Sequence, residues 1–248
     1  MADVELTIDP IHHHNKSEIV DSPSVGFDAA STRLGFIRKV YGIIAVQLTL
    51  TVLISAIAMA TPYSGFGAFL STNNWICWLC IAVNITSVLL IFCYSQQVPY
   101  NFIFLGIFTL SESLIVAKIC VEFTLIGEGT SVLTAAIMTL GVTIGLTLYA
   151  ALTKTDFTFK GGMITVFIVA FLLFGMFACF QSYNLLHSFY CLLGVIVYGF
   201  YIIFDTQLIV GGHTHKLAID DYTMGALMLY VDIIGLFLYI LAEVARKR

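Results

Sequence analysis

Seven long apolar stretches set the fold class of this chain. They lie at residues 38–60, 75–95, 100–121, 131–152, 162–182, 187–210 and 223–242. Each is close to the roughly 20 residues that an α-helix needs to cross a bilayer. Hydrophobic residues make up 59% of the 248 residues and charged residues 10%, which excludes an ordinary soluble domain. The sequence therefore predicts an all-α membrane protein with seven transmembrane helices in residues 33–248, after a disordered polar tail in residues 1–32.

The last apolar stretch, Tyr222 to Glu243, carries a carboxylate, Asp232, near its middle. An aspartate at the centre of a membrane helix costs about 2.5–3.5 kcal/mol on insertion scales, so it needs a partner or faces a cavity. At helical spacing Asp232 shares a stripe with small and polar residues, which are Gly225, Met228, Gly235, Tyr239 and Glu243. Such a helix is expected to be surrounded by other helices.

The preceding apolar stretch supplies a second carboxylate, Asp205. This residue shares a helical stripe with Gly194, Tyr198 and Tyr201. If a hairpin joins the two helices, they run antiparallel, and a rise of 1.5 Å per residue puts Asp205 about 8 Å and Asp232 about 15–17 Å below the same membrane surface. Two nearby carboxylates do not both ionise easily in a low-dielectric site, so we expect them to share a proton and titrate as a pair. Once ionised, they become hard oxygen ligands for a transient Ca²⁺ ion.

A third acid, Glu112, lies near the middle of the third stretch between Ser111 and Ser113. Two interpretations stay open: these residues line a polar pore, or Glu112 is a neutral, hydrogen-bonded structural acid. Lys118 precedes Glu122 by one helical turn, and we expect the lysine to reach the interface and pair with that glutamate.

Basic residues indicate the topology, because cytosolic loops are enriched in Lys and Arg. Arg33, Arg38 and Lys39 precede the first stretch, which predicts a cytosolic N-terminus. Alternation also places the basic residues of two later loops in the cytosol, namely Lys154, Lys160 and Lys216.

The last stretch allows two topologies. A full crossing puts the basic residues 246–248 outside, against the charge rule, whereas a re-entrant helix returns them to the cytosol. Because the stretch is long enough to cross completely, we favour the full crossing.

Two motifs are interpreted as structural. Cys77 and Cys80 form a Cys-x-x-Cys pair inside an apolar stretch with no second pair, so we read them as small hydrophobic residues rather than a zinc or redox site. Asn84-Ile-Thr matches a glycosylation acceptor but lies within a predicted span. We expect no cofactor, with Ca²⁺ as a permeant ion.

Several stretches from the first span to the C-terminus resemble the lifeguard family of transmembrane Bax-inhibitor-motif proteins. They are Phe36-Ile-Arg-Lys-Val-Tyr-Gly, Val98-Pro-Tyr-Asn, Phe108-Thr-Leu-Ser-Glu-Ser, Thr147-Leu-Tyr-Ala-Ala-Leu-Thr-Lys-Thr-Asp-Phe, Ile203-Phe-Asp-Thr-Gln-Leu-Ile and Leu229-Tyr-Val-Asp-Ile-Ile-Gly-Leu-Phe. The resemblance implies a central last helix wrapped by the other six. It also implies a calcium leak across intracellular membranes, suppression of apoptosis, and a pH-sensing aspartate pair that carries over onto Asp205 and Asp232. In two places the chain departs from the family: Gly235 stands where many relatives have asparagine, and residues 94–98 lack the basic residues of bacterial members.

The leading functional hypothesis is a pH-sensitive calcium leak channel of endoplasmic reticulum or Golgi membranes, with the plasma membrane as the alternative location. Its partners are expected to be the bilayer, Ca²⁺ and apoptosis-regulating membrane proteins, and no nucleic acid. The main alternative is a non-conducting membrane regulator of apoptosis, and a proton-coupled exchanger uses the same residues. An intramembrane aspartyl protease would also pair two aspartates, but its Gly-x-Gly-Asp and Pro-Ala-Leu motifs are missing. A purely structural role for both aspartates is the remaining possibility, and we expect no enzymatic activity.

Overall fold

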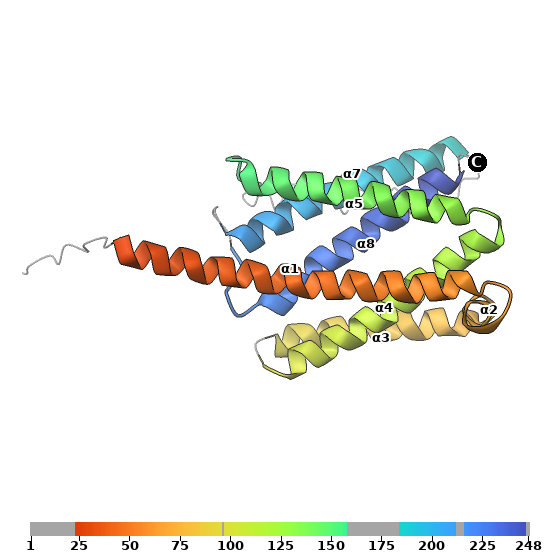
Figure 1. Cartoon of the computed structure of the whole chain (residues 1–248), viewed down its shortest axis with the longest axis horizontal. Helices are drawn as coiled ribbons and strands as arrows, with labels where there is room; N and C mark the ends of the chain where they lie inside the picture. The colour runs from red at the N-terminus through yellow and green to blue at the C-terminus, as the bar shows by residue number, and fades with distance from the viewer. Residues whose placement is uncertain (1–22, 96, 158–183, 212–215, 247–248) are drawn as a thin grey trace, which may run out of the picture.

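The protein is helical throughout the part of the chain that its structure, a computed structural model, describes (Figure 1). The described residues are 23–246 except 96, 158–183 and 212–215. The helices within them are α1 (Pro23–Ala60), α2 (Gly65–Thr72), α3 (Asn74–Tyr94), α4 (Tyr100–Leu125), α5 (Gly129–Leu152), α7 (Asn184–Val210) and α8 (Tyr222–Arg246). These ranges contain no strand, so the predicted all-α class is confirmed.

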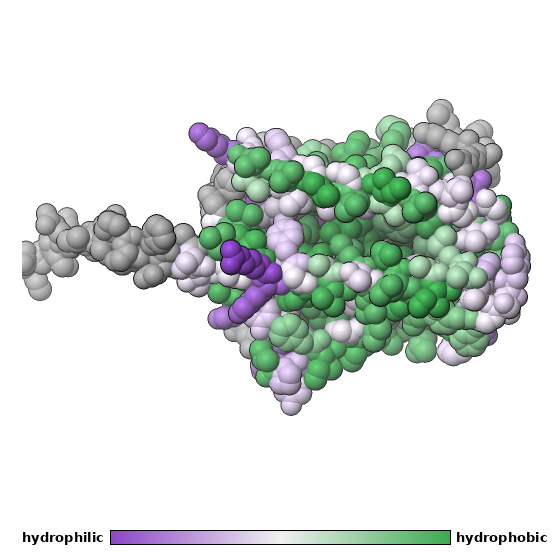
Figure 2. All heavy atoms as spheres, in the orientation of Figure 1, coloured by the Kyte–Doolittle hydropathy of each residue, from purple (hydrophilic) through white to green (hydrophobic). Residues whose placement is uncertain are grey.

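Six of these helices, all except α2, are long and apolar enough to cross a membrane. They coincide with six of the seven predicted spans, and the seventh, residues 162–182, lies outside the described residues. Figure 2 shows hydrophobic side chains over the sides of the helices and a group of hydrophilic ones near the beginning of α1. Since apolar side chains face lipid in a membrane bundle, the chain is a multi-pass integral membrane protein.

Two features near the ends of the bundle differ from the predicted spans. Helix α1 begins at Pro23, so residues 23–32, expected in the disordered tail, are helical. Helix α2 is a short additional helix between the first two spans. It approaches α1 closely, because a Cβ at Gly67 would lie 2.2 Å from the Ala58 carbonyl oxygen.

Helix α2 is held to α4 by Lys118. The ammonium group of this buried side chain donates hydrogen bonds to the carbonyl oxygens of Leu70 at 3.0 Å and Ser71 at 3.2 Å. It also forms the predicted ion pair with Glu122, at 2.9 Å. A cation at the carbonyl end of a helix satisfies acceptors that have no partner within the helix. Lys118 is therefore both an ion-pair partner and the cap of α2.

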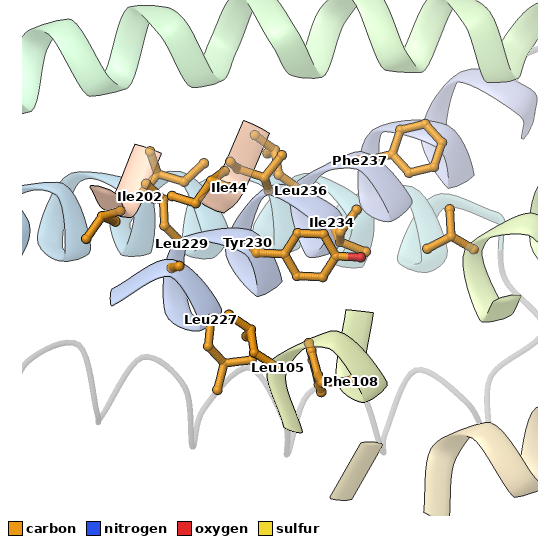
Figure 3. Close-up of a cluster of buried hydrophobic side chains, with 14 of the residues drawn as sticks. Ile44, Leu105, Phe108, Ile202, Leu227, Leu229, Tyr230, Ile234, Leu236 and Phe237 are labelled. Carbon is orange, nitrogen blue, oxygen red and sulfur yellow. The ribbon is translucent and has the colours of Figure 1, made fainter. Parts of the chain in front are cut away.

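Helix α8 packs against α1, α3, α4, α5 and α7. Figure 3 shows its apolar side chains among those of the neighbouring helices, including Ile44 of α1, Leu105 and Phe108 of α4, and Ile202 of α7. The Tyr230 ring is fully buried and meets the Phe108 ring edge-on, with centroids 6.1 Å apart. The stronger prediction, that six other spans wrap α8, extends to residues 162–182 outside the described residues and stays a prediction.

Helix α8 is uninterrupted from Tyr222 to Arg246. It ends at the same end of the bundle as α2, opposite the beginning of α1 (Figure 1). Its 25 residues span about 37 Å at 1.5 Å per residue, more than the roughly 30 Å of a bilayer core. This geometry supports the full crossing over the re-entrant helix.

Candidate functional site

Asp205 of α7 and Asp232 of α8 meet at the interface between the two helices. Their exposed fractions are 3% and 6%, and the two carboxyl groups lie close enough to interact with each other. Because an ionised carboxylate can only accept, a hydrogen bond between them requires a proton on one of the two groups. The structure thus brings together the two acids that the helical stripes placed on facing surfaces.

Each of these aspartates also keeps one unpartnered oxygen. Oδ1 of Asp205 and Oδ2 of Asp232 are buried and receive no hydrogen bond from any described residue. Leaving a buried polar atom unpaired costs about 1–3 kcal/mol, more for a charged group, so such atoms call for an explanation. Two carboxylate oxygens free of other partners are the donor type that a hard cation such as Ca²⁺ prefers.

The α7–α8 interface continues from the aspartates towards the α2 end through two reciprocal glycine–tyrosine contacts. A Cβ at Gly235 would lie 2.3 Å from the Tyr198 ring, and a Cβ at Gly194 would lie 2.4 Å from the Tyr239 ring. Each helix therefore supplies one glycine and receives one ring. Small residues allow close approach of membrane helices, and here they seat aromatic rings. The helical stripes predicted around Asp205 and Asp232 are therefore the surfaces through which α7 and α8 touch.

The interface ends at a third acid, Glu243 of α8, which is buried. The Ser188 hydroxyl of α7 lies 2.8 Å and 2.7 Å from its two carboxylate oxygens. Glu243 belongs to the stripe predicted for the last span, but its serine partner carried no signal in the sequence. These contacts place the beginning of α7 beside the end of α8, as an antiparallel pair requires.

Glu112 is joined to α3 by a polar contact inside the bundle. Asn84 Nδ2 donates to Glu112 Oε2 at 2.5 Å, and the Ser111 hydroxyl donates to Asn84 Oδ1. Glu112 and Ser111 thus share a single partner on α3. Asn84 lies within α3, one of the helices that are long and apolar enough to cross a membrane.

Ser113 faces a different set of residues from Ser111. Its hydroxyl lies 2.9 Å from Thr51 Oγ1 of α1, and Thr51 Oγ1 lies 2.8 Å from the Tyr230 hydroxyl of α8. This buried network ties α1, α4 and α8 together. The three residues grouped as possible pore lining therefore divide into an α3-facing pair, Glu112 and Ser111, and a separate Ser113.

Residues 33–248 match the protein family described as "Inhibitor of apoptosis-promoting Bax1". The chain belongs to this Bax-inhibitor family. It is 33% identical over 242 residues to Protein lifeguard 3 of Homo sapiens, covering 94% of this chain and 76% of that protein. It is 31% identical over 246 residues to Protein lifeguard 3 of Mus musculus, covering 95% and 78%. It is also 36% identical over 219 residues to Protein LIFEGUARD 3 of Arabidopsis thaliana, covering 84% and 83%. The resemblance seen in the sequence is confirmed.

In this member of the Bax-inhibitor family, Arg33 caps the end of α7, close behind Asp205. Its guanidinium donates to the carbonyl oxygens of Leu208 at 2.6 Å, Val210 at 3.2 Å and Leu217 at 2.7 Å. A cation here also complements the negative end of the helix dipole. Gly211 follows with φ +74°, and a Cβ there would lie 2.5 Å from Arg33 Nε. The sequence marked Arg33 only as a topology signal.

Gln207, two residues after Asp205, holds the segment that follows α5. Its Nε2 donates to the Thr155 carbonyl oxygen at 2.9 Å, and its Oε1 accepts from the Phe157 amide at 2.9 Å. The side chain is fully buried, so both halves of its amide are satisfied within the fold. In the sequence, the only indication of this role was the presence of a glutamine within an apolar stretch. Together, Arg33 and Gln207 fix the turn of α7 that carries Asp205.

Proposed function

We propose that this protein is a pH-sensitive calcium leak channel of intracellular membranes, gated by the Asp205–Asp232 pair. The observation that carries the proposal is the burial of the two carboxyl groups beside each other, with one oxygen on each that receives no hydrogen bond from any described residue. A titratable contact between two spans is the kind of element that a proton can switch, and carboxylate oxygens suit a hard permeant cation.

The proposed gate uses the two protonation states of the pair. With one shared proton, the carboxyl groups attract each other and hold α7 against α8. When that proton is lost, two like charges face each other in a low-dielectric site and repel. The same step turns both groups into ligands for a transient Ca²⁺ ion. Further pore-lining oxygen atoms are proposed to come from Glu112 and Ser111, and from Ser113 on the other side of α4.

The proposed cellular role is suppression of apoptosis through calcium homeostasis. It is supported by the name of the matching family and by the relatives named Protein lifeguard 3. We place the protein in the endoplasmic reticulum or Golgi membrane, with the plasma membrane as the alternative, and its N-terminus in the cytosol. The basic side chains Arg33, Arg38 and Lys39 at the beginning of α1 support that orientation. Apoptosis-regulating membrane proteins are the proposed partners besides the bilayer and Ca²⁺.

The test is calcium entry into liposomes that contain the purified protein, measured from acidic to neutral pH. For the parent, we expect flux to be low in acid and to rise as the pair loses its shared proton. Asp205→Asn and Asp232→Asn each remove one charge of the pair, so the pH step should disappear in both. A parent that conducts with an unchanged pH step in either variant would overturn the gate.

The same assay separates the alternatives. A non-conducting regulator of apoptosis, favoured by the family name alone, gives no flux at any pH. A proton-coupled exchanger moves protons in fixed proportion to Ca²⁺. An aspartyl protease loses all activity in both variants at every pH, and residues 229–231 before Asp232 are Leu-Tyr-Val rather than its Gly-x-Gly. We therefore propose no enzymatic activity and no bound cofactor.

A further inference from the structure

Three tyrosine rings fill the α7–α8 interface between the aspartate pair and the α2 end of the bundle. The ring centroids of Tyr198 and Tyr239 are 5.7 Å apart, as are those of Tyr239 and Tyr190. The hydroxyls of Tyr190 and Tyr239 lie 3.1 Å from each other. The rings therefore form one continuous series of a tilted and an edge-on contact, here called the tyrosine stack, which crosses the interface from α7 to α8 and back to α7.

This stack lies about two helical turns from the aspartate pair on α7. Tyr198 lies seven residues before Asp205 on α7, which is about 10 Å along the helix at 1.5 Å per residue, and its glycine seat, Gly235, lies about one turn beyond Asp232. At the other end, Tyr239 and Tyr190 lie within about one helical turn of Glu243 and Ser188 on their respective helices. An ion moving along this interface from the α2 end would meet the rings before the aspartates.

The glycine seats make the stack depend on the distance between the helices. The Tyr198 ring can lie against Gly235, and the Tyr239 ring against Gly194, only while α7 and α8 are in backbone-close contact, because even a methyl group would not fit. Repulsion within the ionised aspartate pair acts on the same two helices. Separating α7 from α8 would withdraw both rings from their seats at once.

We propose that Tyr198, Tyr239 and Tyr190 form an aromatic barrier that closes the conduction path on the α2 side of the aspartate pair. This inference rests on the proposed function and names the steric element that the protonated pair keeps closed. The protonation state of the aspartate pair controls the distance between α7 and α8, and the tyrosine rings block the path. Glycine at 194 and 235 is required because the barrier needs space in the opposite helix.

Calcium entry into proteoliposomes in acid, where the pair is protonated, tests the barrier. Tyr198→Ala and Tyr239→Ala should each raise flux severalfold above the parent. Tyr198→Phe and Tyr239→Phe keep the rings and should stay closed. Phe200→Ala is the matched control, since it removes an aromatic ring from the exposed side of α7 and should leave flux unchanged. Thermal unfolding in detergent verifies that each variant is folded.

The flux of the parent and of the alanine variants together distinguishes failure of the barrier from failure of the gate. If the parent conducts at neutral pH but neither alanine variant exceeds it in acid, the barrier is wrong and the proposed function stands. If the parent is silent at every pH but both alanine variants conduct, the barrier holds and the regulated leak is wrong. If no form conducts, both are overturned. If flux in acid also rises in Phe200→Ala or in the phenylalanine variants, the rings of Tyr198 and Tyr239 are not the barrier.

Discussion

The Tyr198 ring occupies the space that any side chain at Gly235 would need. A Cβ there would lie 2.3 Å from Tyr198 Cε1, 2.4 Å from Cζ and 2.8 Å from Cδ1. The ring cannot yield without leaving its place between α7 and α8, because its neighbour Tyr239 is seated in the same way against Gly194.

Gly235→Ala should therefore destabilise the protein by about 1–3 kcal/mol, the usual cost of overpacking a well-packed interface. Thermal unfolding measures the loss. Tyr198→Ala removes the obstructing ring, so adding Gly235→Ala to it should cost much less than in the parent. Gly141→Ala in α5 is the control, because among the described residues no atom outside the helix's own backbone lies within 4 Å of a Cβ at that position. Equal losses from Gly235→Ala with and without the Tyr198 ring would show that the two residues are not coupled.

Stability should fall as pH rises through the titration of the aspartate pair. In the proposed gate the folded protein holds a proton between Asp205 and Asp232, whereas free aspartates in the unfolded chain are ionised at neutral pH. Because the folded state then binds more protons, the free energy of unfolding decreases with increasing pH. Thermal unfolding across the acid-to-neutral range should show a higher midpoint in acid. Asp205→Asn should flatten this dependence, and a parent midpoint that rises with pH would contradict the shared proton.

Arg33→Met should loosen the end of α7 while leaving the rest of the bundle folded. The variant loses three hydrogen bonds to backbone carbonyls and a cation at the helix C-terminus, a loss of about 1–2 kcal/mol. Hydrogen exchange of the backbone amides in residues 205–211 should become faster. Arg38→Met removes an exposed charge from the same helix and is the control. Unchanged exchange in Arg33→Met would mean that α7 does not depend on this cap.

The spans and the aspartate pair could be predicted because the bilayer imposes strong rules on sequence. A crossing helix needs about 20 apolar residues, which made six of the described helices visible as apolar stretches. Asp232 and Asp205 interrupt such stretches, where a carboxylate is costly, so they were conspicuous. Helical spacing then placed each of them on the stripe that the structure uses for contact.

Other features left weaker signals. Helix α2 is far shorter than a span, and its cap, Lys118, lies on α4, distant in the chain. Gln207 recognises backbone atoms of residues 155 and 157, which no side-chain pattern reveals. Ser111 and Ser113 were grouped by proximity in sequence, although residues two apart in a helix do not share a face. Helical geometry alone would have separated them.

The attachment of α2 by Lys118 also has a consequence for how deep we expect the protein to sit in its membrane. The exposed aromatic side chains Tyr63, Phe66, Phe69, Trp75 and Trp78 lie on α2, just before it and at the start of α3. Aromatic residues concentrate at the membrane–water boundary, where they anchor a protein vertically. Because the buried ammonium of Lys118 binds α2 to α4, we expect the aromatic side chains of α2 to move with the bundle. Their level in the headgroup region would then set the level at which Asp205 and Asp232 lie within the hydrocarbon.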